Sequence, residues 1–209
     1  MHANAMALLF GYLLGSLPVA LVVGRLVAGL DIRRHGSRNA GATNVYRVLG
    51  WKPALVVLVM DLAKGFLAAW SVPLLVSGDP ITLATIAGFG AVLGHCYPVF
   101  AGFAGGKGVA TAAGMVLAVC PIVFPFCLLV FGVILGWTRF ASLASMGGVL
   151  AFPLGLGLFQ ELLNLAVQAP LWIASGSLAV WVLFTHRANI LRLLRGEEGK
   201  LGKNAGSNP

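Results

Sequence analysis

The stretch Cys120-Pro121-Ile122-Val123-Phe124-Pro125 decides how many times this chain crosses a membrane. It lies in the middle of an apolar run that extends from 108 to 137. Proline has no backbone N–H and breaks a helix, so the two prolines predict a hairpin of two short helices instead of one crossing. With a single crossing, the basic segments on either side of the run would fall on opposite faces. The break therefore predicts that these segments lie on the same face.

The rest of the chain is also mostly apolar. Of its 209 residues, 59% are hydrophobic and only 10% are charged, whereas soluble domains carry about 25% charged residues. A helix of about 20 apolar residues crosses a bilayer, so we expect an all-α polytopic integral membrane protein with about seven transmembrane helices. A single membrane domain covers 1–209. Its predicted spans are 5–30, 53–76, 81–100, 108–121, 123–137, 141–159 and 165–185.

The distribution of charge predicts the orientation. The net charge is +8, and the connections 77–80 and 160–164 contain no Lys or Arg. Because cytoplasmic loops are rich in Lys and Arg, we expect the basic connections on the cytoplasmic face, the N-terminus outside and the C-terminus inside. No Lys or Arg precedes the first apolar run, which predicts a retained helix and not a signal peptide. Residues 196–209 are expected to form a loose, polar cytoplasmic tail.

Three polar segments have the composition of anion-binding sites, because accessible backbone N–H groups beside Arg, Lys, Ser and Asn bind phosphate without a metal. The first segment is 36–47, for which the alternative is an ordinary solvated loop. If the chain is helical from Ala42 onward, Thr43 and Arg47 share a face and converge on one group. The candidate binding residues of this segment are Gly36, Ser37, Asn39, Thr43, Asn44 and Arg47.

The second polar segment is the turn Gly105-Gly106-Lys107-Gly108, which opens an apolar helix. Its glycines predict a backbone that wraps an oxyanion at the helix N-terminus, where Lys107 adds a full charge. The alternative is a flexible glycine turn whose lysine extends to the membrane surface. The turn is not a nucleotide-binding P-loop, because Gly108 stands where such a loop has Ser or Thr.

The third polar segment begins at His186. His186, Asn189 and Arg192 repeat at three-residue intervals, so they share one helix face. A histidine there accepts a proton or donates to phosphate, and the alternative is an interfacial helix end with basic anchors. On the same predicted side of the membrane, Ser142 and Ser145 are interpreted either as helix caps or as phosphate contacts.

The remaining polar residues of the spans are interpreted as structural. Asp61 and Lys64 are three residues apart, a spacing that suits a mutually compensated buried pair. His95 is expected to be structural or to support the site residues. The three cysteines lie apart in mostly apolar runs and are expected to behave as small buried hydrophobic residues. Because His, Cys and carboxylates do not cluster at ligand spacing, no metal is expected.

Together the polar segments resemble a known family. The strings are Gly36-Ser-x-Asn-x-Gly-x-Thr-Asn-x-x-Arg47, Gly94-His95-x4-Phe100-x-x-Phe103-x-Gly-Gly-Lys-Gly-Val-Ala-Thr111, and His186-Arg-x-Asn-Ile-x-Arg-Leu193 with Gly196 and Glu198. In this order, and over most of the chain, they resemble the bacterial acyl-phosphate-dependent glycerol-3-phosphate acyltransferase family. The chain departs from that family at Ala104, where a lysine is expected beside the glycine turn.

The resemblance implies transfer of a fatty acyl group from acyl phosphate to the 1-hydroxyl of glycerol 3-phosphate at the cytoplasmic face of the bacterial plasma (inner) membrane. It implies no cofactor, no metal and no nucleic acid. The partners are the two substrates, membrane lipids and the enzyme that makes acyl phosphate. The expected catalytic residues are Ser37, Arg47, Lys107, Ser142, His186 and Asn189. The expected substrate-binding residues are Gly36, Asn39, Thr43, Asn44, Gly105, Gly106, Gly108, Ser145 and Arg192.

Each role has a physical reason. Lys107 and the amides of 105–108 are expected to bind phosphate, and Arg47 to contact the second phosphate or the leaving group. Ser37, Asn44, Ser142 and Asn189 are expected to orient the acceptor. His186 is either the base or a phosphate ligand, and in the second case the substrate phosphate takes the proton. The chain contains no Gly-x-Ser-x-Gly motif, so direct attack without an acyl-enzyme is the simpler hypothesis.

Two other functions fit part of the pattern. A small membrane permease for organic phosphates could use the glycine turn and Lys107, but transport requires a site near the midplane that both faces can reach. A membrane phosphatase or phosphoalcohol transferase usually needs a cluster of metal-binding carboxylates. The chain has only six acidic residues, and they are dispersed.

Overall fold

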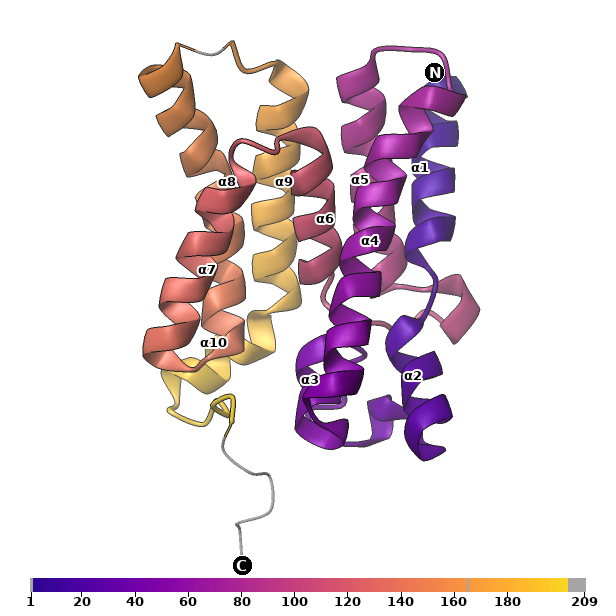
Figure 1. Ribbon diagram of the computed structural model, residues 1–209, viewed down its shortest axis with the longest axis vertical. Coiled ribbons are helices and arrows are strands. Elements are labelled where there is room, and N and C mark those ends of the chain that lie inside the picture. Colours follow the sequence, from indigo (N-terminus) through magenta and orange to yellow (C-terminus); the bar gives the residue numbers. More distant parts are fainter. Residues whose placement is uncertain (1, 165, 203–209) are drawn as a thin grey trace, which may run out of the picture.

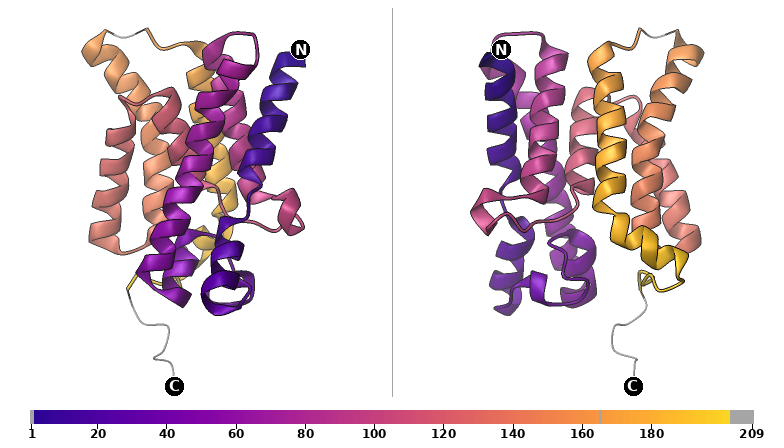
Figure 2. Two further views of the ribbon diagram at one scale, coloured as in Figure 1. Left: turned by 45° about the vertical axis from the view of Figure 1, so that its right-hand side comes forward. Right: turned by 180° about the vertical axis from the view of Figure 1, so that it is seen from behind.

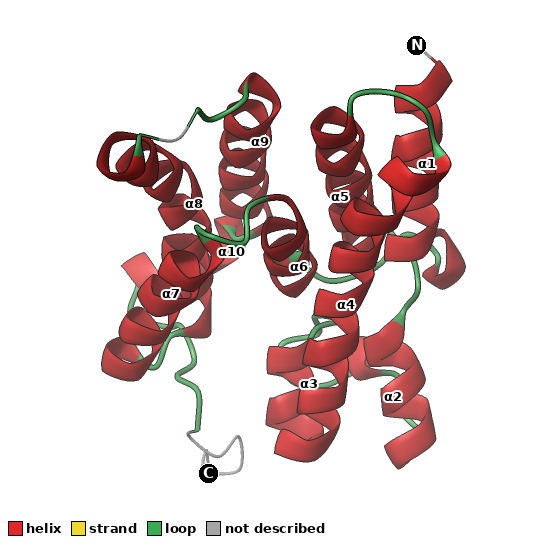
Figure 3. Cartoon of the chain, turned by 45° about the horizontal axis from the view of Figure 1, so that its top comes forward, coloured by secondary structure: helices red, strands yellow, loops and turns green. Residues whose placement is uncertain are grey.

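The computed structural model describes residues 2–164 and 166–202, and every regular element in this part of the chain is helical (Figure 3). The helices are α1 (His2–Gly15), α2 (Val19–Ala28), η1 (Ile32–Arg34), α3 (Ala42–Leu49), α4 (Trp51–Leu75), α5 (Pro80–Cys96), η2 (Val99–Ala101), α6 (Val109–Val119), α7 (Phe124–Thr138), α8 (Ala141–Leu163), α9 (Ala169–Thr185) and α10 (Arg187–Leu194).

The longer helices run alternately up and down the long axis of the molecule (Figures 1 and 2). The α4–α5 and α8–α9 connections lie at one end with the N-terminus, and α2, α3 and α10 lie toward the other end (Figure 1). The two connections without Lys or Arg are therefore at the end opposite α2, α3 and α10, whereas the α5–α6 connection, which contains Lys107, lies near mid-height (Figure 1).

Four segments of the described chain are long and apolar enough to cross a membrane, and α9 and α10, which are bent by 60° relative to each other, add a fifth only if the pair is counted as one span. The four are His2–Ala28, Trp51–Leu75, Pro80–Ala101 and Ala141–Leu163. Helices α6 and α7 are shorter apolar helices. Seven crossings and the orientation of the termini stay predictions.

Proline determines both breaks in the long apolar runs. The run 108–137 divides into α6 and α7, with the break at 120–123, as predicted. The first run, predicted as one helix over 5–30, is instead divided into α1 and α2 at Ser16–Pro18. Pro18 lacks a backbone N–H and disfavours a helical conformation of the residue before it, which explains the second break.

Glycine lets the helices of the first half approach closely. A Cβ atom added at Gly11 or Gly15 of α1 would overlap the backbone of α5, and one added at Gly114 of α6 would overlap the Leu62 carbonyl of α4. Small residues of this kind permit close helix packing where lipid offers no hydrophobic driving force. The result is a tightly packed unit of α1, α4, α5 and α6.

The predicted buried pair in this unit is confirmed. Lys64 Nζ lies 2.9 Å from Asp61 Oδ1, and both side chains are buried. Lys64 also donates to the Leu17 carbonyl at 3.2 Å, at the break between α1 and α2. His95 Nδ1 lies 3.3 Å from the same Asp61 oxygen. A charge buried among apolar helices is stable only when it is paired in this way.

Candidate active site

A cavity of about 520 Å³ lies between the first and second halves of the molecule. Its polar end is lined by side chains of all three polar segments, namely Ser37, Asn39, Thr43, Asn44, Arg47, Lys107, His186, Asn189 and Arg192, together with Ser142, Ser145 and Glu198. Its apolar wall is lined by Leu58, Leu62, Val116, Phe124, Leu128, Phe131, Val149 and Phe152. The predicted convergence of the polar segments is therefore confirmed.

Asn44 shapes the first polar loop. Its Oδ1 accepts a hydrogen bond from the Ser37 amide at 2.8 Å, and its Nδ2 donates to the carbonyls of Ile32 and His35, both at 3.0 Å. Gly36 has a φ of 56°, and a Cβ there would overlap Asn44 Oδ1. Both amide hydrogens of Asn44 are used within the loop, so this residue positions Ser37.

The short helix α3 begins at Ala42, as the interpretation of Thr43 and Arg47 required. Both residues line the cavity from one face of α3. The Arg47 guanidinium also donates to the Gly199 carbonyl at 2.9 Å. Arg47 therefore connects α3 with the C-terminal segment, which follows α10.

The glycine turn differs from its prediction. The Gly105 amide donates to the Cys96 carbonyl and the Gly106 amide donates to the His95 carbonyl, both at 3.1 Å. These two amides are therefore occupied, and neither glycine lines the cavity. A Cβ at Gly106 would overlap the His95 ring, so Gly105 and Gly106 serve close packing against the end of α5.

The N-terminus of α6 remains available to an anion. Gly108, with a φ of 82°, precedes the first residue of α6, and Gly108, Val109 and Ala110 all line the cavity. The first N–H groups of a helix have no partner within the helix and carry a partial positive charge. The part of the predicted oxyanion site that the geometry favours is thus the first turn of α6.

Lys107 is one of the cations that line the cavity. Its Nζ donates to Asn189 Oδ1. Burial lowers the pKa of Lys107 to about 8, an effect that Glu198 opposes and that Arg192 and Arg47 reinforce. Since this pKa is above 7, the ammonium is mostly charged at neutral pH and can neutralise a phosphate.

His186 is held as a neutral ring. It is only 2% exposed, and Nδ1 lies 2.8 Å from the Val182 carbonyl. Because a carbonyl oxygen only accepts, Nδ1 carries the proton and Nε2 is left as the basic nitrogen. Burial, reinforced by the charge of Lys107, lowers the pKa of His186 to about 4.

Glu198 is a residue of the cavity for which the sequence analysis predicted no role. Its carboxylate accepts hydrogen bonds from Ser142 Oγ at 2.7 Å, Asn189 Nδ2 at 2.6 Å and Arg192 Nε at 2.8 Å. Burial alone would raise the pKa of Glu198, but these hydrogen bonds lower it. The only sequence signal was its presence in the third family string.

The C-terminal segment also makes more contacts than expected up to Gly202. Besides Glu198 and Gly199, the Leu201 amide donates to the Arg139 carbonyl at 2.7 Å. The expectation of a loose tail is therefore wrong for 196–202, because three separate contacts tie this segment beneath the cavity. The remaining part of the predicted tail, 203–209, lies outside the described residues.

The two serines of α8 do not cap the helix. The N-cap residue of α8 is Phe140. Ser142 donates to Glu198, and Ser145 Oγ donates to the Ala141 carbonyl of its own helix at 2.7 Å. Both line the cavity. The cap interpretation is thus wrong, and contact with a bound phosphate stays a prediction.

Of the predicted site residues, only Gly36, Gly105 and Gly106 are absent from the cavity wall. Arg38, Asp61 and His95 lie on the wall without having been predicted as site residues. In the described part of the chain, no group of three or more His, Cys, Asp or Glu side chains is arranged to hold a metal ion.

The fold and the cavity define a class, that of helical membrane proteins with a cavity lined by both cationic and apolar side chains. A sequence profile of the family described as glycerol-3-phosphate acyltransferase matches residues 5–196. The glycerol-3-phosphate acyltransferase of Salinibacter ruber is 41% identical over 214 residues, which cover 96% of this chain and 93% of that protein. The corresponding Geobacillus kaustophilus protein is 45% identical over 198 residues, with 95% and 96% covered.

A solved structure agrees with these sequence relatives. The crystal structure of PlsY (YgiH), an integral membrane glycerol 3-phosphate acyltransferase in its glycerol 3-phosphate form, is similar with a TM-score of 0.83 and 39% identity. The similarity covers 95% of this chain and 96% of that one. The chain belongs to the glycerol-3-phosphate acyltransferase family, and it is a membrane acyltransferase.

Proposed function

We propose that this protein transfers a fatty acyl group from acyl phosphate to the 1-hydroxyl of glycerol 3-phosphate, giving lysophosphatidic acid and phosphate. The observation that carries the proposal is that cationic and apolar side chains line one and the same cavity. The relatives named above act on glycerol 3-phosphate by name, and a second PlsY structure is of a lysophosphatidic acid form. A phosphate and a long alkyl chain need these two environments side by side.

The polar end offers positions for two phosphates. Lys107 and the first turn of α6 bind one phosphate, and Arg47 neutralises the second phosphate or the leaving group. Ser37, with its amide fixed by Asn44, and Asn189 orient the acceptor. Ser142 also orients the acceptor. Ser142 and Asn189 both donate to Glu198 Oε1, which holds the two side chains next to each other. Arg192, Asn39, Thr43 and Ser145 complete the polar wall.

The reaction is a direct substitution at the acyl carbon. The 1-hydroxyl oxygen forms a bond to the carbonyl carbon, and the bond from that carbon to the phosphate oxygen breaks. The hydroxyl proton passes to His186 Nε2 or to the substrate phosphate. Acyl phosphate is already an activated anhydride, so positioning and charge neutralisation supply much of the rate enhancement.

An acyl-enzyme is not part of the proposal. In the described residues, neither Ser37 nor Ser142 is hydrogen-bonded to His186, whose Nδ1 is paired with Val182. The partner of Ser142 is Glu198, whose carboxylate also accepts hydrogen bonds from Asn189 and Arg192. A serine nucleophile needs an adjacent base that is free to take its proton.

The substrates and the charge pattern support a location for the active site. We propose that the active site opens to the cytoplasm from the bacterial inner membrane, where the reaction is the first step of phospholipid synthesis. The enzyme that makes acyl phosphate is the partner that supplies the donor. No cofactor, metal or nucleic acid enters the proposed reaction.

The test uses purified protein with hexadecanoyl phosphate, labelled glycerol 3-phosphate and a metal chelator. We expect labelled lysophosphatidic acid with phosphate released in equal amount. The same assay with acyl-CoA as donor should give none. Uptake of glycerol 3-phosphate into vesicles without formation of lysophosphatidic acid would support a permease and overturn the proposal.

The role of His186 is tested separately with His186→Ala. If Nε2 is the base, kcat falls and the dependence of kcat on pH changes. If the substrate phosphate takes the proton, the variant keeps the pH profile of the unmodified protein and only KM rises. The second result would remove His186 as the base and leave it as a phosphate ligand.

A further inference from the structure

The backbone between α5 and α6 leaves the bundle as an irregular segment. The part around η2 protrudes sideways from the bundle at mid-height (Figures 1 and 2). Tyr97, Phe100 and Phe103 are 44%, 60% and 59% exposed there. Aromatic side chains are enriched at membrane–water interfaces, and irregular backbone at membrane depth is tolerated only if protein groups satisfy its carbonyls.

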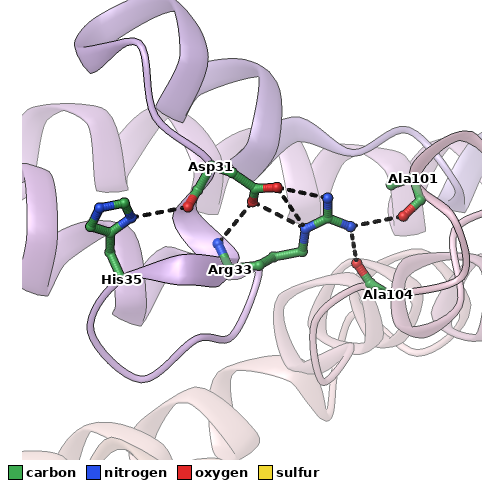
Figure 4. A network of polar contacts seen from close by, with 5 residues as sticks. All are labelled: Asp31, Arg33, His35, Ala101 and Ala104. Atoms are coloured by element: carbon green, nitrogen blue, oxygen red, sulfur yellow. Dashed lines mark hydrogen bonds and ion pairs between the residues drawn. The ribbon is translucent and has the colours of Figure 1, made fainter.

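Arg33 satisfies two of these carbonyls. Its Nη1 donates to the Ala101 carbonyl at 2.8 Å and to the Ala104 carbonyl at 3.3 Å (Figure 4). Arg33 belongs to η1 in the first polar loop, more than sixty residues earlier in the chain. One side chain therefore joins the loop that contains Ser37 to the segment that leads into Lys107.

Asp31 fixes the direction of that side chain. Its Oδ2 accepts from Arg33 Nη2 at 2.8 Å and its Oδ1 accepts from Arg33 Nε at 3.1 Å, while Oδ1 also accepts from the Arg33 amide at 3.0 Å (Figure 4). Hydrogen bonds from Arg33 lower the pKa of Asp31 to about 2. The carboxylate stays charged at every pH of interest, and a two-point pair of this kind fixes the guanidinium plane.

The segment that Arg33 holds has a strained conformation. Gly102 and Phe103 have φ angles of 64° and 59°, and a bulky residue seldom adopts a positive φ. The Phe103 amide donates to the Pro98 carbonyl at 2.9 Å, and the Gly105 amide then returns to Cys96. Such a conformation persists only when surrounding contacts enforce it, and the contacts from Arg33 are of that kind.

We propose that Asp31 and Arg33 form a clasp that positions Lys107. The clasp holds Ala101 and Ala104 against the first polar loop and so fixes where the glycine turn begins. Neither residue lines the cavity, so both are positioning residues and not catalytic ones. The effect of the clasp on acyl transfer rests on the proposed function, whereas its effect on the position of Lys107 does not.

The test compares Arg33→Ala, Arg33→Lys and Asp31→Asn with Arg34→Ala, a matched control in the same short helix whose exposed side chain contacts neither carbonyl. The first measurement is the titration of Lys107 by NMR after 13C reductive methylation, with Lys107→Arg used for assignment. We expect the pKa of Lys107 to rise from about 8 toward the ordinary 10.5 in Arg33→Ala, because a released turn exposes the ammonium to water. Arg34→Ala should keep the original value.

The second measurement is the kinetics of acyl transfer. We expect Arg33→Ala to lower kcat/KM for glycerol 3-phosphate about 100-fold, since a displacement of about 1 Å costs that much, and Arg33→Lys to recover part of the loss. An Arg33→Ala protein with unchanged Lys107 titration and unchanged kinetics overturns the clasp. If Arg33→Ala does not fold, the same readouts on Arg33→Lys and Asp31→Asn decide. Absence of acyl transfer in the unmodified protein would overturn the proposed function only, because the titration of Lys107 still tests the clasp.

Discussion

The two sides of helix α6 are packed very differently. Toward α4, Gly114 approaches the Leu62 carbonyl and Gly65 approaches the Thr111 carbonyl so closely that neither has room for a Cβ atom. Toward α7, the cavity separates the helices, and α7 contributes no buried residue. A region with few buried contacts opens at a lower free energy than a closely packed one. The first side can therefore hold Lys107 in a fixed position, while the second can admit an alkyl chain.

The largest effect should come from removing Lys107, which the closely packed side of α6 holds in position. We expect Lys107→Ala to lower kcat/KM for glycerol 3-phosphate about 1,000-fold, the upper range for loss of one charge-stabilising donor in an active site. Steady-state kinetics with hexadecanoyl phosphate measures this. Leu154→Ala, which removes an exposed apolar side chain outside the cavity, is the control and should change little. A fall of less than tenfold in Lys107→Ala would mean that another group binds the phosphate.

The packing difference itself can be tested with one substitution at two sites. Gly114→Ala should destabilise the protein by about 3 kcal/mol, because the added methyl group overpacks the contact with α4. Gly132→Ala on α7 has no atom within 4 Å of the new Cβ, and alanine favours a helix by about 1 kcal/mol. Thermal unfolding in detergent should show a lower Tm for the first variant and an equal or higher Tm for the second. Equal Tm changes would contradict the comparison.

The charge of Lys107 predicts a pH dependence. Burial lowers its pKa to about 8, so the binding-competent ammonium is present below this pH and is lost as the pH rises through it. Above pH 8, kcat/KM for glycerol 3-phosphate should fall about tenfold per pH unit. Lys107→Arg keeps its charge and should move this fall to higher pH. A pH profile of Lys107→Arg that still falls at pH 8 would assign the titration to another group.

The smallest effect is expected on the open side of α6. Ala113 lines the apolar wall, and Ala113→Leu should reduce the space for a long chain. We expect kcat/KM to fall about tenfold for hexadecanoyl phosphate relative to dodecanoyl phosphate, in the range that hydrophobic pockets achieve. Val133→Leu, at an exposed position of α7 outside the cavity, is the matched control. If both variants keep the original chain preference, the alkyl chain lies elsewhere.

The sequence by itself determined the features that depend on local pattern. Apolar run length predicted a helical membrane protein, and Pro121 and Pro125 predicted the α6–α7 break. Helical periodicity predicted that Thr43 and Arg47 share a face, and that His186 and its partners share another. Each of these follows from residues within a few turns of one another, where helix geometry fixes the relation. The break at Pro18 rests on the same kind of local signal but was missed inside a continuous apolar run.

Only the tertiary structure decided the relations between distant segments. It brought Glu198 to Ser142, and Gly199 to Arg47, although nothing in the spacing of these residues predicts a contact. It also showed that the Gly105 and Gly106 amides donate to carbonyls at the end of α5, so that Gly108 and the first turn of α6, and not these two glycines, face the cavity. The physical reason is that a hydrogen-bonding group binds whichever partner the packing of the helices brings to it, and this packing depends on the whole chain.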